Sequence, residues 1–278
     1  MIKMIKRWLI TGDLHANISR FKNLPKEDQE DENLGIIILG DSGFNYTMDV
    51  NDSHLKNTLD KRYKFTLYCL RGNHEARPQN VQGMKLVYDE NVCGEVYMQD
   101  KWPKIRYFKD WGVYTIDSYK VAVVGGAYSV DKFYRLQNNL RWFEDEQLDT
   151  DEMIHCTRDF TNLKVDVVLT HTCPKSWEPT DMFLPSINQS KVDKSMELFL
   201  EELAQVFDWN CWLFGHYHAD RLERPHVEIL YHDMEDLNDI MVRWGGYDET
   251  GELDWWLHKS PNFYLEDYIN PHHFKDRR

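Results

Sequence analysis

The chain has 278 residues, of which 42% are hydrophobic, with 33 Lys or Arg against 47 Asp or Glu. This length and apolar content predict a folded protein with a sizeable buried core and argue against disorder. The formal net charge of −14 disfavours long nucleic acid as a partner without excluding it, because an acidic surface repels a phosphate backbone.

The cysteines and the apolar runs indicate the cellular compartment of the protein. The chain has five cysteines and no CxxC pair, which is typical of reduced, cytoplasmic proteins and not of a disulfide framework or a zinc ribbon. The basic start is followed by only a short apolar run, residues 8–10, too short for a signal peptide. No run approaches the ~18 apolar residues of a membrane span. We therefore expect a cytoplasmic protein with no membrane partner.

Short apolar runs alternate with helical patterns along the chain. Strands are predicted at 8–11, 36–39, 65–70, 114–117, 120–124, 165–170 and 209–214, and helices at 50–62, 138–160 and 191–207. The continuous aliphatic run at 36–39 is typical of a strand buried on both faces. A hairpin is predicted to turn at Ser118-Tyr119. The pattern is mixed over 77–112, weak over 227–244 and irregular from Pro261. With no compositional break, the chain is predicted to be one α/β domain over residues 1–278.

Five of the apolar runs end in side chains that bind metal ions. The endings are Asp13-x-His15, Gly40-Asp41, Gly72-Asn73-His74, His171 and Gly215-His216-x-His218. Open α/β sheets place their sites at such strand ends. Leaving His74 aside, the two Asp, one Asn and four His suit Mn, Fe, Zn, Co or Ni, whereas calcium prefers nearly all-oxygen sets. Because seven ligands exceed the need of one tetrahedral ion, the set predicts a pair of divalent ions.

These motifs, in this order, resemble the calcineurin-like metallophosphoesterase superfamily, whose pattern is D-x-H, GD, GNH[ED], H and GHxH. The resemblance covers about residues 8–218 and leaves about 226–278 as a C-terminal extension. It implies an αββα four-layer sandwich, with two mixed sheets flanked by helices and a dinuclear site at the sheet edges. By resemblance, the first ion would be held by Asp13, His15 and His218, and the second by Asn73, His171 and His216. Asp41 would bridge both, and His74 would act on the phosphate and the leaving group.

The resemblance implies hydrolysis of a phosphate ester or anhydride by a hydroxide that bridges two divalent ions, with Mn as the first choice of metal. Asp41 and His74 would be the catalytic residues. Small phosphorylated molecules or nucleotides are the favoured substrates, because the chain is acidic, lacks an arginine at position 45 and has only short basic tracks, such as 101–109 and 275–278. Two alternatives remain: activity of the serine/threonine protein phosphatase type, and a non-catalytic scaffold of the same fold. The complete ligand set argues for an enzyme, and the sequence leaves the oligomeric state open.

The chain departs from the protein phosphatase branch, which reads GD-x-x-D-R-G. Phe44 stands where that branch has the Asp that orients the histidine, and Asn45 stands where it has the phosphate-binding Arg. Asn45 and Arg77 are candidate substrate contacts, although a surface role is favoured for Arg77. A structural ion pair, with Glu75 or another carboxylate, is favoured for Arg71. Tyr128 and Arg135 follow a predicted strand end and are further candidates for lining the site, although neither belongs to a motif.

Overall fold

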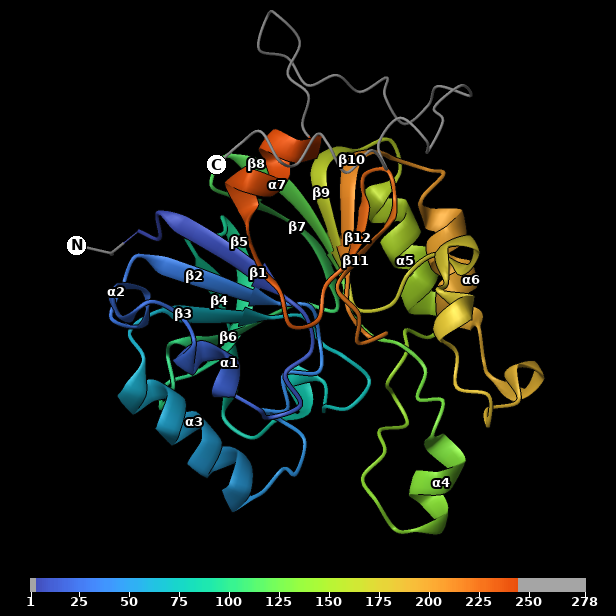
Figure 1. Cartoon of the computed structure of the whole chain (residues 1–278), viewed down its shortest axis with the longest axis horizontal. Coiled ribbons are helices and arrows are strands. Elements are labelled where there is room, and N and C mark those ends of the chain that lie inside the picture. Colours follow the sequence, from blue (N-terminus) through green and yellow to red (C-terminus); the bar gives the residue numbers. More distant parts are fainter. Residues whose placement is uncertain (1–3, 245–278) are drawn as a thin grey trace, which may run out of the picture.

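The computed structural model describes residues 4–244, and two β-sheets packed face to face form its centre (Figure 1). In order across the first sheet, the strands are β13 (Met234–Asp236), β1 (Arg7–Thr11), β2 (Leu34–Ile38), β3 (Thr66–Cys69), β6 (Ile105–Phe108), β5 (Gly94–Gln99) and β4 (Met84–Asp89). Across the second sheet, they are β11 (Arg221–Arg224), β12 (Val227–Ile229), β10 (Asp208–Phe214), β9 (Lys164–Thr170), β8 (Tyr119–Val124) and β7 (Trp111–Ile116).

Both sheets are mixed. β1, β2, β3 and β6 run parallel in the first sheet, and β8, β9, β10 and β12 run parallel in the second. Antiparallel strands complete the edges, with β13, β5 and β4 in the first sheet and β11 and β7 in the second. The parallel strands of each sheet therefore end at the same edge, which is where α/β proteins place their sites.

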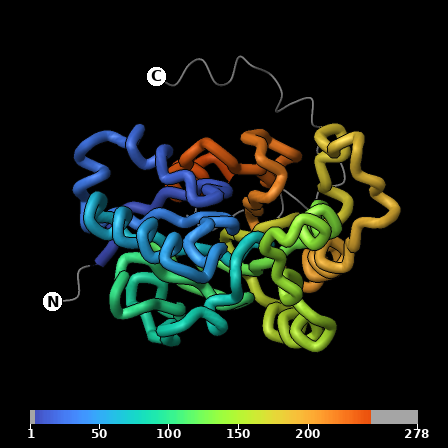
Figure 2. Tube along the Cα trace, turned by 90° about the horizontal axis from the view of Figure 1, so that it is seen from below, coloured from blue at the N-terminus to red at the C-terminus, as the bar shows by residue number. Residues whose placement is uncertain are grey.

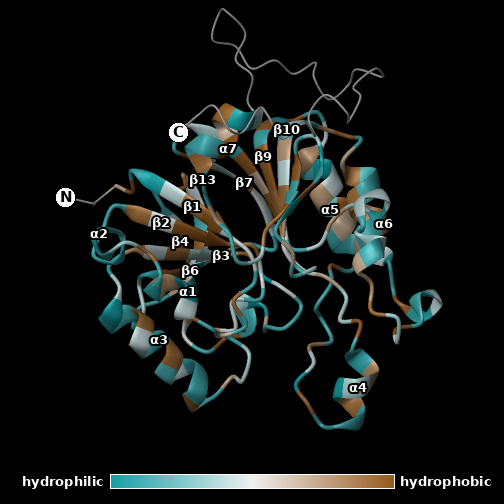
Figure 3. Ribbon diagram, in the orientation of Figure 1, coloured by the Kyte–Doolittle hydropathy of each residue, from teal (hydrophilic) through white to brown (hydrophobic). Residues whose placement is uncertain are grey.

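The central strands are apolar on both faces, as predicted for residues 36–39. Along β2 and just beyond it, Ile37 and Leu39 face the core between the sheets. Ile36 and Ile38 face the core under the helices. This alternation follows from the two-residue period of a strand, and Figure 3 shows the hydrophobic colouring concentrated in the sheets.

The described residues form seven α-helices. They are α1 (Ser19–Lys22), α2 (Lys26–Gln29), α3 (Val50–Arg62), α4 (Lys132–Gln137), α5 (Thr150–Phe160), α6 (Ser195–Leu203) and α7 (Leu237–Trp244). Short 3-10 turns are η1 (Pro78–Asn80), η2 (Lys175–Trp177), η3 (Thr180–Met182) and η4 (Gln189–Lys191). α1 and α3 lie against the first sheet through Phe21 and Leu59, and α5 and α6 lie against the second through Phe160 and Leu200. The four-layer αββα arrangement predicted from the sequence is confirmed.

The view at right angles separates two halves of the chain. The blue-to-teal residues, which include β1, β2 and β3 of the first sheet, lie on one side, and the light-green to orange residues, which include α4, α5 and α6, lie on the other (Figure 2). In Figure 1, α4 projects away from the layers on a loop that leaves β8. We call residues 129–149, which carry α4, the arm.

The predicted helix over 138–160 is wrong for its first half. α4 ends at Gln137, and Asn139 takes a left-handed backbone conformation with φ of 52°, which interrupts a helix. α5 starts only at Thr150, where Asp149 and Glu152 form a reciprocal capping box that fixes the first turn.

The predicted hairpin exists between β7 and β8, but its turn lies one residue earlier than expected. Asp117 and Ser118 both have positive φ, 49° and 70°, as two-residue hairpin turns require when they match the twist of the strands. Residues 77–112, which had no clear pattern, contain β4, β5 and β6.

The weak pattern over 227–244 corresponds to two strands and a helix that complete the core. β12 pairs with β10 in the second sheet, and β13 pairs with β1 in the first. α7 places Ile240 and Met241 in the core between the sheets. The irregular tail predicted from Pro261 lies outside the described residues, so one domain over the whole chain stays a prediction. Within residues 4–244, no helix is both long and apolar enough to cross a bilayer.

Candidate metal centre

The predicted metal ligands lie on loops that follow five strands. Asp13 and His15 follow β1, Asp41 follows β2, and Asn73 follows β3. From the second sheet, His171 follows β9, and the pair at 216 and 218 follows β10. The structure thus brings ligands from both sheets together at the edge where the parallel strands end, as the sequence predicted.

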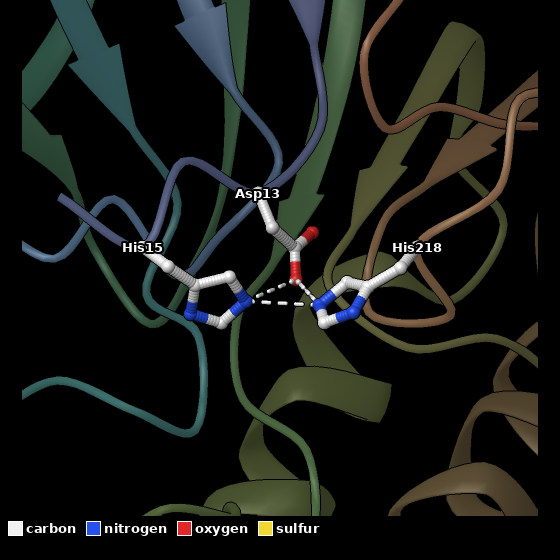
Figure 4. A group of neighbouring side chains, drawn as sticks. All are labelled: Asp13, His15 and His218. Carbon is white, nitrogen blue, oxygen red and sulfur yellow. Dashed lines mark hydrogen bonds and ion pairs between the residues drawn. The ribbon is translucent and has the colours of Figure 1, made fainter. Parts of the chain in front are cut away.

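One group of ligand atoms comes from Asp13, His15 and His218 (Figure 4). The Oδ2 atom of Asp13 lies 3.6 Å from His15 Nε2 and 3.2 Å from His218 Nε2, and the two Nε2 atoms are 2.9 Å apart. Ligands at about 2.1 Å from one ion are roughly 3 Å apart, so this spacing fits a bound cation. Asp13 Oδ2 is buried and accepts no hydrogen bond from any residue in 4–244, which also indicates a missing positive partner.

A second group lies beside it. His171 Nε2 is 2.9 Å from Asn73 Oδ1 and 3.6 Å from Asp41 Oδ2. Asp13, Asp41 and His171 also have ligand atoms within 4.8 Å of one another, so Asp13 is common to both groups. The ring of His216 packs edge-on against that of His171, with centroids 5.0 Å apart. The donor set therefore fits divalent ions, while the division of ligands between two ions and the bridging role of Asp41 stay predictions.

Backbone groups fix the orientation of the buried ligands. The carboxylate of Asp13 accepts from the amide of His216 at 2.9 Å, and that of Asp41 accepts from the amide of His74 at 2.7 Å. In each case Oδ1 is used, which leaves Oδ2 facing the cluster. His171 Nδ1 lies 2.7 Å from the carbonyl oxygen of Leu39. In the neutral ring, a proton on Nδ1 satisfies that carbonyl and leaves Nε2 unprotonated, which is the form that binds a metal.

A short chain of hydrogen bonds orients Asn73. Its Nδ2 donates to Ser129 Oγ at 2.9 Å, so its Oδ1 faces the cluster. The hydroxyl of Ser129 donates in turn to Glu146, whose carboxylate also accepts from the amide of Ser129 at 3.0 Å. Neither Ser129 nor Glu146 was predicted from the sequence. Ser129 follows the end of β8, which is the same signal that identified the ligands, but it carries no recognised motif.

At two of the glycines that precede the predicted ligands, a neighbouring carboxylate leaves no room for a side chain. A Cβ atom on Gly72 would lie 2.0 Å from Asp41 Oδ1, and one on Gly215 would lie 2.4 Å from Asp13 Oδ1. Both contacts are far shorter than atoms allow. The loops therefore approach the carboxylates closely because no side chain stands between them.

The two carboxylates dominate the electrostatics of the site. Burial disfavours their charge, but the His171 imidazole, with neighbouring histidines, outweighs burial and lowers the pKa of Asp13 and of Asp41. Burial likewise opposes a charge on His171, yet Asp41 and Asp13 raise its pKa to about 9. Burial, with the neighbouring His171, lowers the pKa of His216 to about 3. The site thus holds anionic oxygens and attracts positive charge.

A buried glutamate joins the two loops of the first sheet. The carboxylate of Glu75 accepts from the amide and hydroxyl of Ser42, at 3.2 and 2.7 Å, and from Tyr107 at 2.8 Å. It also accepts from the amide of Gly72 at 3.3 Å. Glu75 therefore holds the Asp41 loop against the Asn73 loop.

A family model of calcineurin-like phosphoesterases matches residues 6–220, about three quarters of the chain. The chain belongs to this family. Its members hydrolyse phosphate esters with divalent metal ions, and the matched residues include all seven predicted ligands. A comparison with curated proteins gave no significant match.

The two residues predicted to contact substrate, Arg77 and Asn45, have other partners. Arg77 is buried, and its guanidinium donates to Asp110, Glu152 and the carbonyl oxygens of Asp145 and Gln147. These acceptors use all five of its donors, so Arg77 is neither a phosphate contact nor a solvated surface residue.

Asn45 is also buried, and it lines a cavity to which none of the predicted metal ligands contributes. Its Oδ1 accepts from Lys56 Nζ at 2.6 Å. Arg71 has the structural role that was favoured for it, although its carboxylate partner is Asp110 and not Glu75.

The side chain that reaches His74 comes from the arm. Arg135 Nη2 lies 3.4 Å from His74 Nε2, while its Nε donates to both oxygens of Asp131 at 2.8 Å. Its Nη1 donates to the Tyr46 hydroxyl at 3.1 Å. Burial, together with the Arg135 charge, lowers the pKa of His74 despite the opposing effect of Asp41. Phe44, at the place of the orienting Asp, is packed in the core under the helices.

Proposed function

We propose that the protein is a dinuclear metal-dependent phosphoesterase that acts on small phosphorylated molecules or nucleotides. The observation that carries this proposal is the buried pair of carboxylates, Asp13 and Asp41, with unsatisfied or cluster-facing oxygens surrounded by imidazoles. By this proposal, Asp13, His15 and His218 would hold one ion, and Asn73, His171 and His216 the other, with Asp41 between them. Manganese is the expected metal.

In the proposed reaction, the metal ions and the side chains of the protein would have different roles. Two divalent ions bound here would lower the pKa of a water molecule and neutralise the charge of the phosphoryl group. The carboxylates and imidazoles hold their ligand atoms in place through the backbone bonds described above, so little reorganisation is needed. His74, in its protonated form, would donate a proton to the departing oxygen of the substrate, which is a general-acid role.

Arg135 takes the place of the guanidinium that the sequence lacks at position 45. Its Nη2 points to His74, its Nε is held by Asp131, and its Nη1 donates to the Tyr46 hydroxyl and to the carbonyl oxygen of Arg141. A guanidinium in such a position is suited to a phosphoryl oxygen. The favoured substrates are small because the cavity that His74 lines, together with Val130 and Asp131 of the arm, has a volume of only about 430 Å³.

The completeness of the ligand set distinguishes an enzyme from a non-catalytic scaffold of the same fold. Non-catalytic relatives of an enzyme commonly lose ligands, whereas here every ligand of the motif set is present and most are oriented by hydrogen bonds. The intact arrangement favours an enzyme.

The test compares Mn-dependent hydrolysis of p-nitrophenyl phosphate with that of bis(p-nitrophenyl) phosphate. We expect turnover of at least one ester, its loss on chelation and its return with added Mn. Asp41→Asn should abolish turnover, and Asp151→Asn, which changes an exposed carboxylate, should leave it unchanged. Full activity in the Asp41→Asn variant would contradict the proposal, and metal binding without turnover of either ester would favour a scaffold.

A further inference from the structure

A cavity of about 430 Å³ lies directly beside the metal-ligand cluster. Asp41, Asn73 and His74 line one end of it. The remaining wall comes from the end of β8, the loop between η3 and α6, and the loop after β10. Its apolar and aromatic members include Tyr128, Met182, Phe183, Ile187, Val192 and Tyr217. A space of this size accommodates a small organic molecule, so the organic part of a phosphate ester bound at the cluster would contact this wall.

Two aromatic rings in the wall are nearly parallel. The rings of Phe183 and Tyr217 lie at 14° to each other, with centroids 6.5 Å apart. Flat aromatic faces favour a planar ring, because offset stacking adds to the burial of apolar surface. An aliphatic or sugar group would gain less from this geometry.

The same cavity contains two polar side chains with unused acceptors. Glu197 on α6 is 3% exposed, and its Oε1 accepts from Thr172 Oγ1 at 2.9 Å. Its Oε2, like Oε1 of Gln189, is buried and has no hydrogen-bond partner among the described residues. Leaving such atoms unpaired is costly. The cavity therefore favours a ligand that carries hydrogen-bond donors deep inside it.

The other charged side chains of the wall already have partners. Lys194 Nζ lies 2.5 Å from Glu178 Oε1 and 5.0 Å from the centre of the Phe183 ring. Asp131 pairs with Arg135. The wall is thus better suited to a neutral group with donors than to a second charged group.

We infer that this cavity receives the base of a nucleotide whose phosphate reaches the metal-ligand cluster. A base offers a planar face to Phe183 and Tyr217, and it offers N–H groups to Glu197 and Gln189, whose side chains are among those that recognise base edges. An alkyl phosphate would leave Glu197 Oε2 and Gln189 Oε1 without donors, and a sugar phosphate would add no ring to stack with Phe183 and Tyr217. The inference rests on the proposed function only in assigning the phosphate to the cluster.

The test measures binding without any reaction. Adenosine, guanosine, cytidine, uridine and ribose are titrated separately into the Mn-loaded full-length protein by calorimetry. Nucleosides carry no phosphate, so their binding is independent of hydrolysis. We expect the tightest nucleoside to bind at least about tenfold more tightly than ribose, because stacking and N–H donors are absent from ribose. Equal affinity for ribose and all four nucleosides would overturn the inference.

Two variants test the two contacts separately. Phe183→Leu removes a ring, and Glu197→Met removes the carboxyl but keeps the length of the side chain. Each substitution should lower the affinity for the tightest-binding nucleoside about tenfold and leave the affinity for ribose unchanged. Glu202→Gln, on the exposed side of α6, is the control and should bind like the wild type.

Thermal melting confirms that each variant is folded before binding is compared. Wild-type affinity in either folded variant would overturn the inference. Turnover of p-nitrophenyl phosphate is measured in parallel. No turnover together with nucleoside binding would reject the proposed function alone, whereas turnover without nucleoside binding would reject only the base pocket.

Discussion

At the scale of single residues, several predicted metal ligands are oriented by hydrogen bonds that they make on the side facing away from the cluster. Asp13, Asp41 and His171 each use one atom to bond the backbone and direct the other to the cluster. Asn73 does the same through a side chain, Ser129. Such supporting contacts orient ligands before an ion binds, and their loss commonly costs 10–100-fold in metal affinity.

Ser129→Ala tests this support. The variant keeps every ligand but frees the Asn73 amide to rotate, and it leaves the Glu146 carboxylate without its hydroxyl donor. We expect Mn affinity, measured by calorimetry, to fall about tenfold. Ser186→Ala, in an exposed loop, is the control. Unchanged Mn affinity in Ser129→Ala would show that Asn73 does not need this partner.

His74→Ala separates leaving-group chemistry from metal binding. The side chain of His74 is not among the predicted ligands, so the variant should bind as much Mn as the wild type. Loss of a general acid typically lowers the rate 10²–10⁴-fold, and the loss should be greatest for esters with poor leaving groups. The measurement is kcat for an alkyl ester against that for the p-nitrophenyl ester. An equal decrease for both would contradict the general-acid role.

Residue patterns predicted the clustering of the seven candidate ligands, whereas the two candidate substrate contacts lie elsewhere. The clustering was predictable because each candidate ligand lies one to four residues after an apolar run, and adjacent parallel strands bring such endings together. Arg77 was not predictable, because its partners Asp110 and Glu152 lie 33 and 75 residues away in the chain. Those ion pairs form only because the fold brings the turn between β6 and β7, which carries Asp110, and the first turn of α5, which carries Glu152, next to Arg77.

At the scale of elements, the arm is the least predictable part of the site. Its sequence favours one long helix, but the left-handed Asn139 and the cap at Asp149 leave only α4 and α5. The break lets α4 project from the sandwich (Figure 1), and Arg135 on α4 then reaches His74. The arm also supplies Ser129 and Glu146, so it contributes to both metal binding and the proposed phosphate contact.

Arg135→Ala tests the contribution of the arm to substrate binding. A hydrogen bond to a charged group is worth about 1.5–3 kcal/mol, so kcat/KM should fall about 10–100-fold, while bound Mn stays the same. Free guanidinium ions should restore part of the activity, which a purely structural role would not allow. Arg141→Ala, on the same arm, is the control because its side chain bonds only the Thr47 carbonyl among the described residues. Wild-type kcat/KM in Arg135→Ala would contradict this role.

At the scale of the whole molecule, the fold closes with residues that follow the last metal ligand. β12 and β13 add one strand to each sheet, and α7 fills the core between them. The sequence predicted the sandwich from its strands and motifs. It could not place these short elements, because a three-residue strand has almost no periodicity and depends on its neighbours for pairing.

A chain that stops at residue 220, where the family match ends, tests that closure. It would lose β11, β12, β13 and α7, and with them the buried side chains of Leu237, Ile240 and Met241. Each such side chain contributes about 1.5–3 kcal/mol, and the net stability of a domain is only about 5–15 kcal/mol. We expect circular dichroism to show no cooperative thermal transition. A cooperative transition like that of the full chain would show that the motif region folds alone.

The stoichiometry of bound metal tests the central claim most directly. Native mass spectrometry of the Mn-loaded full-length protein should show two ions per chain, and the Asp41→Asn variant should show one or none because the carboxylate proposed to lie between the ions loses its charge. Two ions in the wild type with fewer in the variant would support a dinuclear phosphoesterase. One ion or none in the wild type, or two in both proteins, would contradict the proposed arrangement.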